Sequence, residues 1–341
     1  MTDPNLLGMS CNPRSVMVTG GAGYVGSALV PKLLEAGHRV SVLDLYLYGD
    51  DVLADVRSNK RLREIKGDLR DAGVVADALQ GCDTVIHLAC ISNDPSYDLD
   101  PDLGRSINYD AFLPLVRASK NAGVELFVFA SSSSVYGIKD ELNVTENLPL
   151  EPLTDYSKFK AKCEETLENE REKGFSTCII RPSTVCGYSP RTRLDVIVNI
   201  LTNHAVNTGR IKVFGGSQKR PNIHIDDMVD VYKFLLDQPR ERIDGGVYNV
   251  GYENHTLMEL ANMVRSVVGN DLEIDILPTD DLRSYHVSSE KIRMELGFIP
   301  QKSIIQAIEG LVAQFKAGKL SNSMEDPKYF NITMMKSADM K

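Results

Sequence analysis

The sequence contains no tryptophan, only 7% aromatic residues, and no apolar run near the ~20 residues of a membrane-spanning helix, so we expect no membrane partner. Its six cysteines form no CxxC pair and no cluster with metal-ligand spacing, which favours reduced thiols and no metal site. Acidic residues outnumber basic ones by 47 to 38, and no basic block is present, which argues against binding to nucleic acid. The N-terminal stretch MTDPNLLGMSCNPR has no basic region followed by a hydrophobic one, so we expect no signal peptide and a cytoplasmic protein.

Short β-branched runs alternate with longer helical patterns over the first half of the chain. We expect strands at 16–19, 40–43, 62–66, 84–88, 126–130 and 176–181, and helices at 26–36, 74–79, 107–121 and 156–173. Strands that alternate with helices indicate parallel βαβ units and a sheet buried on both faces. The sequence therefore predicts an α/β protein with a Rossmann-type, doubly wound parallel sheet.

The pattern changes after Pro182, where the loops become longer. Helices are expected at 194–207, 258–268 and 303–315, isolated strands at 212–214 and 273–277, and a strand at 246–251 that returns to the sheet. We expect a dinucleotide-binding domain over 1–182, joined by 222–252, and a smaller C-terminal α/β substrate domain from 183–221 and 253–341. The polar tail beyond Gly318 either docks on a neighbour or is frayed, and the sequence leaves that open.

A glycine-rich segment, TGGAGYVG over residues 19–26, joins the first strand to the first helix. It fits GxxGxxG, or GxGxxG if the pattern starts one residue later. Glycine permits a tight turn and a close backbone approach, and the helix N-terminus offers free N–H groups to a pyrophosphate. We therefore expect this loop to bind a dinucleotide through Gly20, Gly23, Tyr24, Val25 and Gly26.

Two acidic residues come after the next strands. Asp44 ends the second strand, where a carboxylate accepts hydrogen bonds from the adenosine ribose and repels a 2′-phosphate, so NAD is expected rather than NADP. Asp68 comes after the third strand and could reach the adenine, although a plain turn residue would look the same.

Tyr156 and Lys160 are four residues apart at the start of an expected helix, so they lie on one face of it. A phenol with a reference pKa of about 10 is a poor base at neutral pH. A lysine ammonium and an oxidised nicotinamide ring beside it favour the phenolate and lower that pKa. Ser132 leaves the C-terminal end of the fifth strand, where a hydroxyl can bond to the substrate oxygen that the phenolate deprotonates.

These features together resemble the extended short-chain dehydrogenases/reductases, in the branch of nucleotide-sugar epimerases and dehydratases. The segments that carry the resemblance span about residues 15 to 300: TGGAGYVG, GDLRD (67–71), HLAC (87–90), Ser132 with SSVYG (133–137), YSKFK (156–160), Arg181-Pro182 with Gly187, RPNIHIDD (220–227) and YNVG (248–251). The resemblance implies a Rossmann fold, NAD as cofactor and a nucleoside-diphosphate sugar as substrate.

The resemblance also implies roles for single residues. Tyr156 is the expected base, Lys160 its partner and ribose anchor, and Ser132 the donor to the substrate oxygen. Asn108 matches the asparagine that supports the lysine in this family. The diphosphate of the nucleotide sugar is expected to lie between Arg220 and Arg283, because arginine binds phosphate with planar, permanently charged donors. Further cofactor contacts are expected from Leu69, Leu88 and Ala89, and further substrate contacts from Ser133, Thr184, Arg193 and Asn199.

The reaction depends on the fate of the ketone that forms when a sugar carbon, usually C4 in this branch, is oxidised. A 4,6-dehydratase would need an Asp-Glu pair directly after Ser132, but Ser133 and Ser134 stand there, so dehydratase chemistry is not expected. A 4-epimerase needs only the triad and room for the keto-sugar to rotate, and it is the favoured interpretation. A net C4 dehydrogenase or ketoreductase is the alternative, and a non-catalytic NAD-sensing scaffold a more distant one. Cys186 is a weaker candidate for the acid–base cysteine of 3,5-epimerising relatives.

One position departs from galactose-type epimerases, which usually carry an asparagine where this chain has Thr184. The nucleotide and the sugar therefore stay open, with Arg193 and Asn199 as alternative contacts. The helices expected at 107–121 and 156–173 resemble the pair that forms a four-helix dimer interface in this family, so a homodimer is expected.

Overall fold

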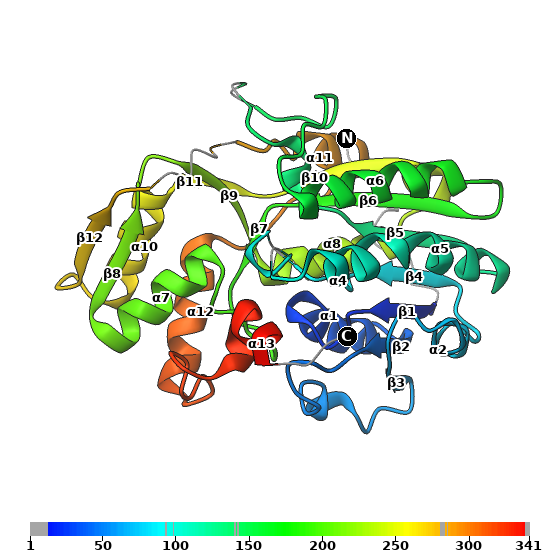
Figure 1. Cartoon of the computed structure of the whole chain (residues 1–341), viewed down its shortest axis with the longest axis horizontal. Coiled ribbons are helices and arrows are strands. Elements are labelled where there is room, and N and C mark those ends of the chain that lie inside the picture. The colour runs from blue at the N-terminus through cyan, green and yellow to red at the C-terminus, as the bar shows by residue number, and fades with distance from the viewer. Residues whose placement is uncertain are drawn as a thin grey trace, which may run out of the picture.

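A seven-stranded parallel sheet forms the centre of the computed structural model, which describes residues 13–92, 94–97, 99–139, 141, 143–279, 284 and 286–337 (Figure 1). The strand order is β10-β6-β5-β4-β1-β2-β3. The strands are β1 (Ser15–Thr19), β2 (Arg39–Asp44), β3 (Leu62–Lys66), β4 (Thr84–His87), β5 (Leu126–Ala130), β6 (Ser176–Pro182) and β10 (Gly246–Val250). The predicted doubly wound fold is confirmed, including the returning strand β10.

Helices cover both faces of this sheet, as alternating side chains on its buried strands require. Val16 and Val18 of β1 pack into one apolar cluster, and Met17 packs into the cluster on the opposite face. The first cluster includes α1 (Tyr24–Glu35), α8 (Ile225–Leu236) and α11 (Glu290–Leu296), and the second includes α2 (Ala72–Ala78), α5 (Phe112–Asn121) and α6 (Asp155–Glu170).

The order of the strands reverses beside β1, which pairs with β2 on one side and with β4 on the other. The connections after β1 and β4 therefore diverge from each other at the carboxyl ends of these strands. Open α/β sheets bind ligands in the crevice that such a reversal creates. The topology thus places the glycine-rich segment at a binding crevice.

A second group of elements lies to one side of the large sheet (Figure 1). A three-stranded sheet contains β7 (Thr184–Cys186), β9 (Lys219–His224) and β11 (Glu253–Thr256), and a two-stranded sheet contains β8 (Arg210–Phe214) and β12 (Glu273–Leu277). Helices α7 (Ile197–Thr208), α10 (Leu257–Val268) and α12 (Ile304–Lys316) share a separate apolar core with β7, β8 and β12. Of the segment 222–252, residues 222–224 belong to β9, and the chain rejoins the large sheet's helices from α8 onward.

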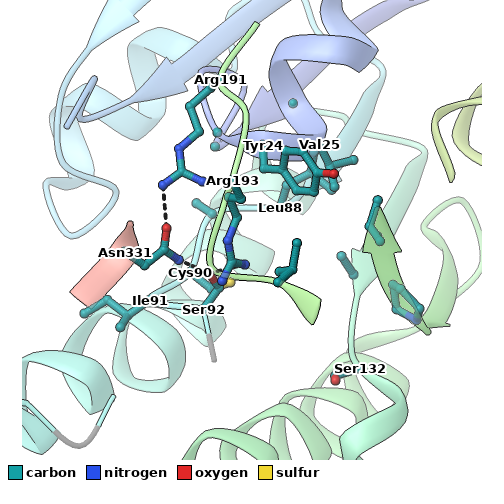
Figure 2. Close-up of a pocket in the computed structure, with 18 of the residues that line it drawn as sticks. Tyr24, Val25, Leu88, Cys90, Ile91, Ser92, Ser132, Arg191, Arg193 and Asn331 are labelled. Atoms are coloured by element: carbon teal, nitrogen blue, oxygen red, sulfur yellow. Dashed lines mark hydrogen bonds between the residues drawn. The ribbon is translucent and has the colours of Figure 1, made fainter. Parts of the chain in front are cut away.

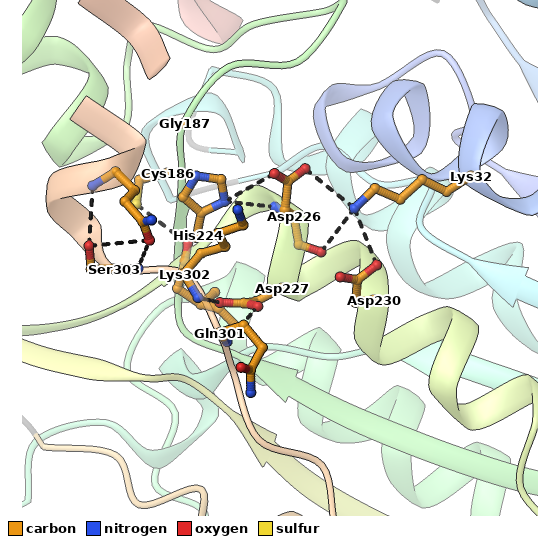
Figure 3. Close-up of polar contacts among 12 residues, drawn as sticks. Lys32, Cys186, Gly187, His224, Asp226, Asp227, Asp230, Gln301, Lys302 and Ser303 are labelled. Carbon is orange, nitrogen blue, oxygen red and sulfur yellow. Dashed lines mark hydrogen bonds and ion pairs between the residues drawn. The ribbon is translucent and has the colours of Figure 1, made fainter. Parts of the chain in front are cut away.

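Polar side chains at the start of α8 join these two groups (Figure 3). Asp227 accepts the backbone N–H groups of Gln301 and Lys302, each at 2.8 Å, just before α12. On the other side, Lys32 of α1 lies 3.2 Å from Asp230. Helix α8 therefore contacts both the segment before α12 and α1.

Several regions differ from expectation or extend it. The helix expected over 107–121 is a π-helical turn, η3 (Ser106–Asp110), followed by α5. Helices α8 and α11 and the strands β7, β9 and β11 were not predicted. The tail folds back on its own chain, because Tyr329 shares an apolar cluster with Leu194 and its carbonyl accepts the Leu194 N–H at 2.9 Å.

The shorter elements are η2 (Ala54–Val56), α3 (Asp94–Tyr97), α4 (Pro101–Arg105), η4 (Ser133–Tyr136), α9 (Arg240–Ile243), η5 (Pro327–Tyr329) and α13 (Asn331–Ser337). Within the described ranges, every helix is too short or too polar to cross a bilayer.

Candidate active site

A cavity of about 550 Å³ opens at the carboxyl ends of β1 to β5. Its wall includes the glycine-rich segment, the residues that come after β2 to β5, the first turn of α6, and parts of 182–197. The second half of the chain completes the wall with Arg220, Met228, Tyr232, Asn331 and Met335. One cavity thus contains most of the predicted cofactor residues and most of the predicted substrate residues.

The glycine-rich segment leaves no space for side chains at two positions. A Cβ on Gly26 would lie 2.2 Å from the Gly20 carbonyl oxygen, and Gly20 has a φ of +73° and packs against the backbone of Ala89. Helix α1 begins at Tyr24 behind Gly23, which has no side chain to cap it. Its first N–H groups therefore face the cavity and form a binding site for an anion such as a diphosphate.

Asp44 is bonded to the glycine-rich segment and lines the cavity. One carboxylate oxygen accepts the Ala22 N–H at 2.9 Å and the other accepts the Tyr46 N–H at 2.8 Å. Burial raises the pKa of Asp44, while these two backbone N–H groups lower it. Each oxygen keeps a further lone pair for a hydroxyl in the cavity, which suits the predicted contact with ribose.

Asp68 also lines the cavity, but its carboxylate is occupied. Arg70 bonds to both oxygens, with the shortest contact at 2.6 Å, and lowers the pKa of Asp68. In the structure this side chain forms an ion pair with a neighbour two residues away, and its contact with adenine stays a prediction. Leu69, Leu88 and Ala89 line the cavity as predicted.

Tyr156, Lys160 and Ser132 all line this cavity. Lys160 is buried, with its Nζ 5.9 Å from the centre of the Tyr156 ring, and donates a hydrogen bond of 2.7 Å to the Ala130 carbonyl at the end of β5. Ser132 caps the short helix η4, and its Oγ lies 2.8 Å from that of Ser134. The helical spacing thus brings the phenol and the ammonium together, and the end of β5 adds the hydroxyl.

A buried polar network supports the serine-rich segment from behind. Ser131 donates to Glu164 of α6, which pairs with Arg181 of β6 at 2.6 Å. Arg181 donates to the hydroxyl of Tyr136 at 2.7 Å, and that hydroxyl donates to Asn249 of β10, also at 2.7 Å. The loop that carries Ser132 is therefore tied to three elements of the large sheet and its helices.

Asn108 does not have the expected contact with the lysine. Its side-chain oxygen accepts the Ile91 N–H at 2.8 Å, and its side-chain nitrogen donates to the Ile91 carbonyl at 2.9 Å. An amide bonded at both ends to one residue's backbone fixes the loop after β4 instead. Asn108 lies within the π-helical turn, a type of distortion that is frequent at functional sites.

The predicted substrate residues divide into three groups. Ser133, Thr184, Arg193 and Arg220 line the cavity. Asn199 does not, because its amide is used by the Gly187 N–H at 2.9 Å, the Tyr24 hydroxyl at 3.1 Å and the Arg193 carbonyl at 2.7 Å. It locks the loop after β7 onto α1, which corrects its predicted role. Arg283 lies outside the described residues.

Cys186 is completely buried and is absent from the cavity wall. Its thiol lies 3.4 Å from the Ile223 carbonyl, and burial raises the pKa of Cys186. A thiol in such a position behaves as a small apolar side chain, so it does not fit an acid–base role. Among the described residues, no group of three or more His, Cys, Asp or Glu side chains could hold a metal ion.

Several residues of the cavity wall were missed by sequence reasoning (Figure 2). Arg191 and Asn331 are hydrogen-bonded to each other, and Asn331 also donates to Ser92 at 2.7 Å. The alternation Arg191-Thr192-Arg193 could have indicated an anion-binding site, because alternate residues of an extended segment point to the same side and two arginines there can face one ligand. Asn331 gave no signal, since it lies 140 residues further along the chain.

The fold and this cavity define a dinucleotide-binding α/β protein whose second half adds to the same site. The model of the NAD dependent epimerase/dehydratase family matches residues 16–251, which is more than half of the chain. The chain belongs to that family, as its motifs predicted.

Relatives within the family include enzymes of more than one activity. UDP-glucose 4-epimerase from Lactobacillus helveticus is 28% identical over 84% of this chain and 92% of its own. The solved structure of DesIV, a dTDP-glucose 4,6-dehydratase from Streptomyces venezuelae with NAD and TYD bound, is 27% identical with a TM-score of 0.82, covering 91% of this chain and 100% of that one. MoeE5 in complex with UDP-glucose and NAD is 27% identical with a TM-score of 0.76, covering 89% and 99%.

Proposed function

We propose that this protein is an NAD-dependent epimerase that inverts C4 of the sugar in a nucleoside-diphosphate sugar. The observation that carries the proposal is the common cavity of Tyr156, Lys160, Ser132 and the glycine-rich segment, with Arg220 on the same wall. The steric limits at Gly26, the uncapped start of α1 and the carboxylate of Asp44 suit a dinucleotide. The relatives crystallised with NAD support the choice of cofactor.

In this proposal the chain's own residues move one proton. NAD⁺, when bound by the glycine-rich segment, would supply a reversible hydride acceptor for the sugar carbon, and return of the hydride to the opposite face would invert C4. Tyr156 removes the proton of the sugar hydroxyl as its phenolate, which the ammonium of Lys160 stabilises by charge. Ser132 donates a hydrogen bond to the same oxygen, and Tyr156 returns the proton when the alcohol forms again.

Lys160 serves this role because its position is fixed. Its hydrogen bond to the Ala130 carbonyl holds the ammonium at the end of β5, in the wall of the cavity. The side chain also lies over the Phe129 ring, 4.9 Å from its centre, so few rotamers remain to be lost on binding. Its ribose-anchoring role and the diphosphate-binding role of Arg220 belong to the same proposal.

The serine-rich segment favours epimerisation over dehydration. Elimination of water needs an acid and a base beside the keto-sugar, and Ser133 and Ser134 provide neither. Both side chains line the cavity, but a serine hydroxyl is too weak an acid and too weak a base at neutral pH to transfer protons at C5 and C6. A net dehydrogenase would use the same triad and differs in its net production of NADH.

The test uses the purified protein with a panel of UDP-, GDP-, CDP- and dTDP-sugars, with the products identified by mass spectrometry and NMR. The expected result is an epimer formed without net change in NADH absorbance. Stoichiometric NADH formation would instead identify a dehydrogenase. A Tyr156→Phe variant is expected to lose turnover by at least about 100-fold and to keep its NAD affinity, with Tyr252→Phe on the exposed surface as the control. Unchanged turnover in Tyr156→Phe would contradict the assignment.

We also propose a homodimer built on α5 and the helix that carries Tyr156. These two helices pack against each other on one face of the large sheet, and they match the helix pair on which the dimer was predicted from the sequence. Sedimentation is expected to give twice the chain mass of 37.7 kDa. A species of single-chain mass at micromolar concentration would rule this out.

A further inference from the structure

We propose that Arg191 and Arg193 form a clamp for the diphosphate of the bound dinucleotide, and that helix α13 latches this clamp through Asn331. The inference rests on the proposed NAD dependence and adds a binding role for the C-terminal tail. Both arginines and Asn331 line the cavity that contains the start of α1 (Figure 2).

Arg191 enters the cavity from the loop after β7 and lies close to α1. Its backbone N–H donates to the Ser27 hydroxyl at 3.1 Å, and its guanidinium lies 3.5 Å from the centre of the Tyr48 ring. The residue is 4% exposed, and its Nε has no hydrogen-bond partner. Burial lowers the pKa of Arg191 to about 10, so the group stays charged at neutral pH. A buried cation with an unused donor calls for an anion in the cavity.

Arg193 presents a second unused donor. Its Nε pairs with Asp195 at 2.9 Å and its Nη1 donates to the Ser92 hydroxyl at 3.2 Å, whereas its buried Nη2 has no partner. Asp195 is the only carboxylate within ion-pair distance of either arginine among the described residues. The two arginines therefore carry one more positive charge than their direct partner neutralises. A diphosphate, with its negative charge and several acceptor oxygens, supplies what both groups lack.

Asn331, the first residue of α13, holds this arrangement. Its side-chain oxygen accepts from Arg191, its side-chain nitrogen donates to Ser92, and its backbone N–H donates to Asp195 at 2.8 Å. It thus contacts the direct partners of Arg193 as well as Arg191 itself. The residue is 2% exposed, and the preceding tail is anchored by Tyr329. Release of α13 would remove an orienting contact from both arginines at once.

The position of Arg191 favours the dinucleotide as the source of the diphosphate. Ser27 belongs to α1 and Tyr48 comes after β2, so the guanidinium lies at the end of the cavity formed by the glycine-rich segment and Asp44. Arg220 lies on β9 and also lines a second hollow formed by α7 and β8, away from α1. The chain thus has two arginine sites for two diphosphates, one for the cofactor and one for the nucleotide sugar.

The test compares the affinities of the cofactor-free protein for NAD⁺, ADP, adenosine and UDP. Arg191→Met keeps a long unbranched side chain beside Tyr48 and removes the charge. We expect this variant to have an affinity for NAD⁺ and for ADP that is about 10- to 100-fold lower, and unchanged affinities for adenosine and UDP. Arg220→Met is expected to show the reverse pattern, with a lower affinity for UDP and an unchanged affinity for NAD⁺. If Arg191→Met lowers the affinity for UDP and leaves that for ADP unchanged, the clamp binds the nucleotide sugar instead. If Arg191→Met changes neither affinity, the proposed clamp is wrong.

The latch is tested by the rate at which NADH leaves the protein. Asn331→Ala is expected to raise this rate by about tenfold, whereas Thr333→Ala, exposed on the same helix, leaves it unchanged. An equal rate in both variants would refute the latch. Thermal unfolding of each variant verifies that it is folded. These experiments measure binding and need no turnover, so they test the clamp and the latch even if the protein is not an epimerase. Likewise, an absent clamp or latch would not contradict the epimerase assignment, which depends on the products formed.

Discussion

The buried pair of Glu164 and Arg181 allows a sharp test of what supports the active-site loop. Substitution Glu164→Gln keeps the shape of the side chain and removes its charge, which leaves the Arg181 guanidinium buried without a counter-ion. Both residues are almost fully buried, at 6% and 5% exposed, and their closest contact is 2.6 Å. In contrast, Glu168 lies one turn further along α6, where it pairs with Arg171 at 2.9 Å but is about half exposed.

The two pairs differ in burial and not in type, so their contributions to stability are predicted to differ strongly. Loss of one partner from a buried pair costs about 3–5 kcal/mol, because the remaining charge cannot be solvated. An exposed pair is worth at most about 1 kcal/mol, since water solvates either charge alone. We therefore expect Glu164→Gln to lower the free energy of unfolding by about 3 kcal/mol or more, and Glu168→Gln to change it by less than about 0.5 kcal/mol.

Urea unfolding followed by circular dichroism measures both variants against the unmodified protein. The double variant Glu164→Leu with Arg181→Met is expected to recover most of the loss, since no buried charge remains unpaired. If Glu164→Gln and Glu168→Gln cost the same, or if the double variant is the least stable, the argument from burial is wrong.

The remaining predictions concern the cofactor site and acid stability. Gly26→Ala is expected to abolish NAD binding, because the new Cβ would lie 2.2 Å from the Gly20 carbonyl oxygen. Gly310→Ala on α12, where a Cβ has free space, is the control and should preserve NAD binding. Calorimetric titration with NAD⁺ measures both variants, and unchanged affinity in Gly26→Ala would contradict the prediction. Asp44→Ser is expected to raise the affinity for NADP relative to NAD, and equal use of both by the unmodified protein would contradict the role of this carboxylate. Burial, aided by Lys160, lowers the pKa of His87 to about 3. Because the unfolded chain binds that proton at about pH 6.5, His87 costs stability as pH falls from about 6.5 towards 3, by up to about 1.4 kcal/mol per unit. His87→Asn should make the decline in unfolding free energy between about pH 6.5 and 5 less steep, and an unchanged slope would refute this.

The sequence was sufficient for the fold and for most of the predicted cofactor residues that the structure brings into one cavity, because the relevant signals are local. Alternation of strand and helix patterns predicts the parallel sheet, and the glycine spacing marks the loop after β1. The four-residue spacing of Tyr156 and Lys160 likewise places them on one helical face, as observed. Asp68 shows the limit of such reasoning, because its position at a strand end was predicted correctly while its ion pair with Arg70 was not foreseen.

Asn108 and Asn199 mark a second limit. Both are buried, and each uses its amide to bind backbone groups of a preceding loop, which lie between 6 and 17 residues earlier in the chain. Sequence patterns indicate that an asparagine is present at a suitable position, but not which backbone groups the folded chain brings against it. The π-helical turn that contains Asn108 was likewise not predicted from the sequence.

The sequence by itself determined the elements whose causes lie within a few residues: the sheet, the glycine-rich segment, the Tyr156–Lys160 pair and the serine-rich segment after β5. Only the tertiary structure decided that the tail folds back on its own chain and that Asn331 joins Arg191 inside the cavity. The physical reason is that hydrogen bonds and ion pairs between segments 140 residues apart depend on how the whole chain packs. No local pattern of residue types specifies such contacts.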